Sequence, residues 1–167
     1  MGVQTDVQVK FIADENAADP DRLVTAARPN TSATMAATTF LGGGARNVTV
    51  TTAGTGDNNK TCTITGTDVF GNAITEVITS TGSAEAVAGA TLFLTVSAVE
   101  CSAQYAANIT VGSGSLCASA VAGGGRTRLK GYSIVSAGTA GLVDFFNGTP
   151  DSGTIIFKAQ TIGTDNS

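Results

Sequence analysis

The residues that could do chemistry in this chain are few, and the segment ITGTDVFGNAITEVI at residues 64–78 holds three of them. Asp68 and Asn72 flank Gly71, and carboxylate and amide oxygens around a glycine occur in calcium-binding loops. An EF-hand loop, however, needs such ligands at alternate positions before its glycine and a glutamate at its end, whereas a valine and a phenylalanine intervene here. We therefore predict that Asp68, Gly71 and Asn72 form a hairpin turn.

Catalytic chemistry has few candidates elsewhere. The chain contains no histidine, which removes the commonest general base and every catalytic triad built on histidine. Acidic residues gather at 14–21, where we prefer a solvated loop to a weak calcium site. Glu76 and Glu100 stand alone within expected strands, and we predict that both are solvated. The sequence therefore predicts a protein that is not an enzyme, with no metal and no cofactor.

A basic stripe is the strongest candidate for an interface. Arg126, Arg128 and Lys130 alternate along the chain, so in a strand they would share one face with Tyr132. Such a stripe either docks an acidic surface or guards a sheet edge against aggregation. Both interpretations stay open, and we treat these four residues as interface candidates.

The composition narrows the class of protein. Charged residues make up 13% of the 167 residues, against about 25% in ordinary globular domains. The net charge is −4 and no large cluster of Lys and Arg exists, so we expect no direct contact with nucleic acid. No apolar run reaches the roughly 20 residues of a membrane helix, and we expect a protein made in the cytoplasm. The three cysteines are interpreted as free thiols, mostly buried, with no redox role.

Alternating patterns rich in threonine and glycine predict an all-β chain, an antiparallel β-sandwich or jelly roll of about eight to nine short strands. We expect the apolar run at 90–100 to be a central strand covered on both faces, with residues 107–114 as its neighbour. The full set of strands expected after residue 42 is 46–53, 61–67, 73–79, 90–100, 107–114, 126–137, 141–146 and 153–162.

The first 41 residues follow a different pattern. A short strand within residues 3–12 leads into a polar segment with no sustained period, in which Pro20 and Pro29 discourage helix. We predict that residues 1–41 form an N-terminal strand and an extended arm, which packs against another chain or stays mobile in isolation. Residues 42–167 would then be the β-sandwich domain.

Two segments resemble structural proteins of tailed bacteriophages. GTDVFGNAITEVI is similar to a GTD-x-x-GN-x-x-TE-x-(I/V) hairpin found in capsid-associated and tail-associated β modules. LKGYSIVSAGTAGLVDFFNGTPDSGTIIF resembles small virion proteins in which a strand, a Gly-Thr-Ala-Gly turn and a further strand recur. Together these resemblances cover roughly residues 46–80 and 126–158.

The resemblance implies a virion protein, most similar to a capsid decoration or cement protein. Its partners would be the major capsid protein or other virion proteins, and it would assemble as a homo-oligomer, a trimer in many such families. The function expected is to stabilise the capsid by bridging neighbouring capsid subunits. The alternatives are a tail or fibre-anchoring protein and an immunoglobulin-like module that binds a host-surface glycan.

Overall fold

The computed structural model describes residues 18–82, 84–119, 141–147 and 153–161. Strands take up 58% of it and helix 3%, which confirms the all-β prediction. The chain divides into two compact units, residues 1–121 and 122–167. This division differs from the predicted boundary after residue 41.

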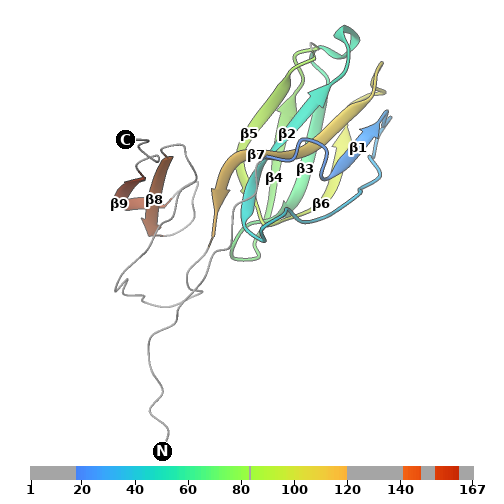
Figure 1. The fold of residues 1–167 in the computed structure, drawn as a ribbon. Coiled ribbons are helices and arrows are strands. Elements are labelled where there is room, and N and C mark those ends of the chain that lie inside the picture. The colour runs from blue at the N-terminus through green and yellow to red at the C-terminus, as the bar shows by residue number, and fades with distance from the viewer. Residues whose placement is uncertain (1–17, 83, 120–140, 148–152, 162–167) are drawn as a thin grey trace, which may run out of the picture. The chain divides into compact units, whose positions relative to one another are not determined.

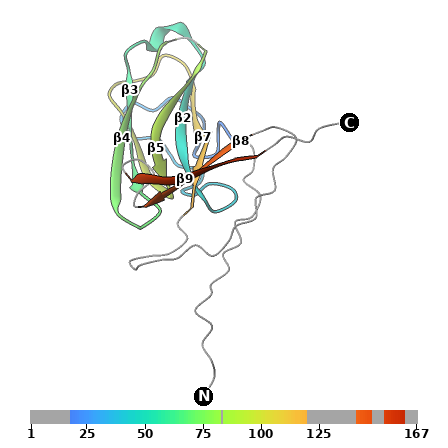
Figure 2. The same ribbon diagram turned by 90° about the vertical axis from the view of Figure 1, so that its left-hand side faces the viewer.

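Two antiparallel sheets form the first unit. The first sheet has the order β1-β7-β2-β5, and the second has the order β4-β3-β6. Apolar residues from both sheets, among them Val50, Ile64, Val99 and Val111, pack in one buried cluster, and Figure 2 shows β3 and β4 on one side of this core and β2 and β7 on the other. The unit is therefore a β-sandwich. Its strands are β1 (Val24–Ala27), β2 (Ala45–Thr52), β3 (Thr61–Thr67), β4 (Ala73–Thr79), β5 (Ala86–Phe93), β6 (Thr95–Cys101) and β7 (Ile109–Ala118).

The second unit is described as a hairpin of β8 (Gly141–Asn147) and β9 (Thr154–Thr161). The two strands pair antiparallel at the positions where the sequence pattern predicts them. The predicted strands at 3–12 and 126–137 lie outside the described residues.

The prediction of one central strand at residues 90–100 is wrong. The chain bends at Leu94, so β5 belongs to the first sheet and β6 to the second. Phe93 and Val96 are both fully buried although they are three residues apart, which a straight strand with a period of two does not allow. β7 pairs with β1 and β2 and not with this run. The strand covered on both faces is β2, where seven of the eight residues are buried.

The described part of the predicted N-terminal arm packs against its own sandwich, which neither expected alternative, packing against another chain or mobility in isolation, anticipated. Leu23 is fully buried and Phe40 is 4% exposed, so this segment supplies its own sandwich with core residues. Its backbone pairs with both sheets, through β1 with β7 and through residues 31–39 with β6. Figure 1 shows the segment before β1 running across β7. The segment closes one side of the sandwich and covers two strand edges that would otherwise invite pairing with another chain.

Candidate functional site

The turn between β3 and β4 contains the residues predicted to turn the chain. Asp68 Oδ1 accepts hydrogen bonds from the amides of Phe70 at 2.8 Å and Asn72 at 2.9 Å, and its Oδ2 accepts one from Asn72 Nδ2 at 2.9 Å. Gly71 has a φ of +84°, in the left-handed region that favours glycine. The amide of Asp68 donates to the carbonyl of Asn72 at 2.9 Å. These contacts use the polar groups of the motif to hold the hairpin.

The pKa of Asp68 reflects the same contacts. Burial raises it, but the hydrogen bonds from Asn72, Phe70 and Gly71 outweigh that effect and the pKa lies below the usual value of 3.8. The carboxylate is thus ionised at neutral pH and already bonded within its own turn. It is a structural group and a poor candidate for a base.

The other residues singled out in the sequence lie outside this turn or outside the described residues. Arg126, Arg128, Lys130 and Tyr132 lie outside the described residues. Glu76 is not solvated as expected, because its Oε1 accepts hydrogen bonds from the amides of β5 residues Ala90 at 2.7 Å and Thr91 at 3.2 Å. Glu76 lies on β4, so this carboxylate joins the edges of the two sheets on one side of the sandwich.

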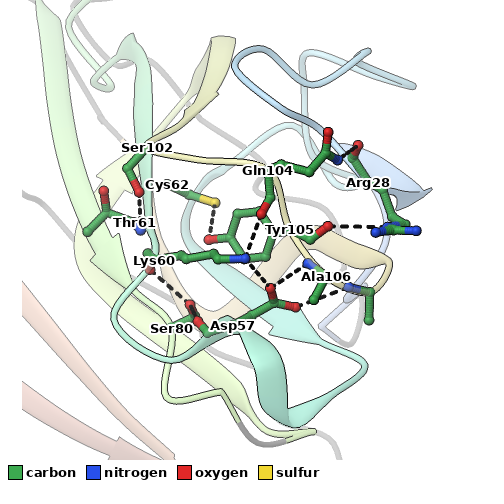
Figure 3. A network of polar contacts seen from close by, with 11 residues as sticks. Arg28, Asp57, Lys60, Thr61, Cys62, Ser80, Ser102, Gln104, Tyr105 and Ala106 are labelled. Atoms are coloured by element: carbon green, nitrogen blue, oxygen red, sulfur yellow. Dashed lines mark hydrogen bonds and ion pairs between the residues drawn. The ribbon is translucent and has the colours of Figure 1, made fainter.

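A buried polar cluster that the sequence patterns did not predict lies at one end of the sandwich (Figure 3). Asp57 is fully buried at the end of the short 3₁₀ turn Thr55–Asp57. Its Oδ1 accepts from Lys60 Nζ at 2.7 Å and from the amide of Ala106 at 2.6 Å, and its Oδ2 accepts from the amide of Ala107 at 3.3 Å. The carboxylate therefore ties the loop before β3 to the loop before β7.

The electrostatics of Asp57 follow from these donors. Burial raises the pKa of Asp57. The hydrogen bonds from Lys60 and from the amides of Ala106 and Ala107 lower it by more, so that the pKa lies below the usual value of 3.8. Lys60 also donates to the carbonyl of Gln104 at 2.5 Å and its Nζ lies 5.4 Å from the centre of the Tyr105 ring. The ion pair is therefore held at both ends by contacts with the loop before β7.

Tyr105 connects this cluster to two thiols. Its ring is fully buried, and its hydroxyl lies 3.3 Å from Cys62 Sγ, which is 3.7 Å from Cys101 Sγ. None of the three cysteines is in a disulfide; Cys62 and Cys101 are buried and Cys117 is exposed, in line with the prediction of thiols that are mostly buried. The sequence offered a signal for Cys62 alone, which alternates with Ile64 on a strand with buried alternate positions. Cys101 follows directly after the strand expected at 90–100, and the register that brings the two cysteines together is not a local property.

The second unit carries exposed apolar side chains. Leu142 is 71% exposed, Ile156 66% and Ile155 39%, while Phe145 and Phe157 stack across the strands with ring centres 4.0 Å apart. An ion pair of 3.4 Å links Asp144 and Lys158, the only two charged residues of β8 and β9. A two-stranded hairpin is at best marginally stable in water by itself, so this one depends on further contacts.

Neither a cluster of metal-ligating side chains nor a membrane-spanning helix occurs in the described part of the chain. Within it, no three His, Cys, Asp or Glu side chains are grouped so as to hold a metal ion, and no helix there is long and apolar enough to cross a membrane. Comparison with known proteins adds no relative, since no family model, no curated protein and no solved structure matches the chain.

Proposed function

We propose that this protein is a non-enzymatic structural component of a phage particle, which decorates the capsid and stabilises it by bridging neighbouring capsid subunits. The proposal would make it a virion protein, produced in the host cytoplasm, with the major capsid protein as its partner and a homo-oligomer as its working form.

The observation that supports the proposal most is the exposed apolar surface of the β8–β9 hairpin. Leu142 and Ile156 are 71% and 66% exposed on an element with one positive and one negative side chain. Large exposed apolar groups of this kind mark protein contacts, and burying them against a partner would stabilise the hairpin as well as the complex. Most of the hairpin, from residue 141 to residue 158, also lies within the segment 126–158 that resembles virion proteins.

The hydrogen bonding within the sandwich is consistent with the same proposal. Three carboxylates of the sandwich, those of Asp57, Asp68 and Glu76, bind backbone amides of the chain itself. A cement protein acts by adding contacts that must break before the shell loosens. A stable sandwich together with a hairpin that exposes apolar side chains is sufficient for that role.

The proposal can be tested with shells assembled from the major capsid protein encoded in the same genome. The purified full chain is mixed with these shells and sedimented, and its oligomeric state is measured alone. We expect the protein to sediment with the shells, and the double variant Leu142→Asp, Ile156→Asp to remain in the supernatant. Val77→Asp is the matched control, because Val77 is 59% exposed but lies on β4 of the sandwich.

Each other outcome identifies a different role. Failure of the wild-type chain to bind shells would refute the capsid proposal, and copurification with tails instead would support a tail or fibre-anchoring protein. Binding of the chain to a glycan array would favour the host-surface module. Equal loss of shell binding in Val77→Asp would show that the hairpin is not the docking element.

A further inference from the structure

Two buried thiols face each other across the second sheet. Cys62 on β3 and Cys101 on β6 are directly opposite in the antiparallel register, and their sulfur atoms are 3.7 Å apart. Cys62 is fully buried and Cys101 is 8% exposed. The two cysteines are therefore cross-strand neighbours whose sulfur atoms are in contact.

The hydrogen bonds around the pair identify the kind of site. The amide of Cys101 donates to Thr31 in the N-terminal segment, away from β3, whereas the next amide, that of Ser102, donates to the carbonyl of Thr61 at 3.0 Å. Cys62 and Cys101 therefore occupy a non-hydrogen-bonded pair of the ladder. Cα atoms in such pairs are about 4.5 Å apart, within the range of about 4.4–6.8 Å that a disulfide spans.

From this geometry we infer that Cys62 and Cys101 form a cross-strand disulfide when the folded protein meets a small-molecule disulfide such as oxidised glutathione. The sulfur atoms need to approach from 3.7 Å to about 2.0 Å. Rotation of the two side chains, with the strands already at the right spacing, supplies most of this movement. The inference revises the prediction that the cysteines have no redox role, and the chemistry is independent of the function proposed above.

The reaction proceeds in two exchange steps. Because Cys62 is fully buried, the small disulfide reaches it when the sheet opens locally; the Cys62 thiolate then attacks, the small S–S bond breaks, and one small thiol leaves with a proton. The Cys101 thiolate then attacks Cys62 Sγ, and the second small thiol leaves. The protein loses two electrons and two protons in total, and the small disulfide is reduced to two thiols.

The surroundings favour Cys62 as the first nucleophile. Hydrogen bonding from Cys101 lowers the pKa of the Cys62 thiol, burial opposes this, and the Tyr105 hydroxyl lowers the pKa further. The hydrogen bond to Cys62 and burial both raise the pKa of Cys101. A thiolate at Cys62 would accept hydrogen bonds from both the Cys101 thiol and the Tyr105 hydroxyl, and these two contacts favour its formation there.

The test uses the full chain with Cys117→Ser, so that the exposed thiol does not react. The protein is incubated with oxidised glutathione, and free thiols are counted after unfolding. We expect both thiols to disappear together, with an intact mass lower by two hydrogen atoms. A protease specific for glutamate cuts after Glu76, Glu85 and Glu100 and so separates the two cysteines, which lets a linked peptide pair be identified without reduction.

Thermal unfolding gives the second readout. Because the disulfide closes a loop of about 40 residues, we expect the oxidised protein to melt about 10 °C higher, and dithiothreitol to reverse the shift. The matched control is Cys101→Ser in the same background, which should accept one glutathione at most and show no rise. Stable glutathione adducts on both cysteines of the parent protein, or a lower melting temperature after oxidation, would overturn the inference.

Discussion

Replacing Asp57 with asparagine should destabilise the sandwich, because this buried carboxylate holds two distant loops together. Asparagine can keep an oxygen toward Lys60 and Ala106 but turns an amino group toward the amide of Ala107. Hydrogen bonds to a charged group contribute roughly 1.5–3 kcal/mol each and neutral ones about 1 kcal/mol. The weakened hydrogen bonds from Lys60 and Ala106, and the loss of an acceptor for the amide of Ala107, should together lower the free energy of unfolding by about 3 kcal/mol. This corresponds to a fall in Tm of about 12 °C.

The effect of Asp57→Asn depends on pH in a defined direction. The folded-state pKa of Asp57 lies below 3.8, so its contribution to stability is present above that pH and is lost as the pH falls through the folded pKa. Urea unfolding of both proteins should therefore show a gap at neutral pH that closes in acid, because the protonated wild-type side chain then also lacks the charge.

Asp68→Asn is the control for the Asp57 variant. Asparagine also suits turns of this type, but it weakens the two bonds that Oδ1 accepts and loses the contact between Oδ2 and Asn72 Nδ2. All these contacts lie within one short turn, so we expect a loss of about 1–2 kcal/mol, smaller than that of Asp57→Asn. The reasoning about Asp57 is refuted by a difference from wild type under about 0.5 kcal/mol, or by one that stays constant down to about pH 2.

Three further variants test the fold. Gly66→Ala should lower the free energy of unfolding by about 3 kcal/mol, because the new Cβ would lie 1.9 Å from the carbonyl oxygen of Thr95. Gly71→Ala meets open space and should lower it by only about 1–2 kcal/mol, for the positive φ at this position. Urea unfolding that ranks the two variants the other way would contradict this account. Leu23→Ala should cost about 3 kcal/mol in the same assay, and an unchanged midpoint would mean that the N-terminal segment is not part of the core. Glu76→Gln should cost about 1 kcal/mol and speed hydrogen exchange of the two β5 amides that it binds; unchanged exchange would show that the carboxylate does not hold this edge.

Local patterns were sufficient for the all-β class and for most strand positions. Alternation at 61–67 and 73–79 matches β3 and β4, because a period of two is a property of consecutive residues. The turn around Asp68 is equally local, since its contacts reach only to Asn72.

Patterns failed where one segment served both sheets. The apolar run at 90–100 has the composition of a single covered strand, yet the bend at Leu94 sends its two halves to different sheets. The N-terminal segment has no period because it crosses strand edges and does not form a long strand, so its core residues Leu23 and Phe40 stand isolated in the sequence.

What the sequence determined by itself was the all-β class, the positions of several strands such as β3 and β4, and the chemistry of the turn at Asp68. Only the tertiary structure decided which side chains meet. Asp57 contacts residues about 50 positions away and Cys62 faces a partner 39 positions away. Such contacts depend on strand order and register, which are set by the packing of the whole core. A shift of β3 by one residue, for example, would turn Cys62 to the opposite face of its sheet.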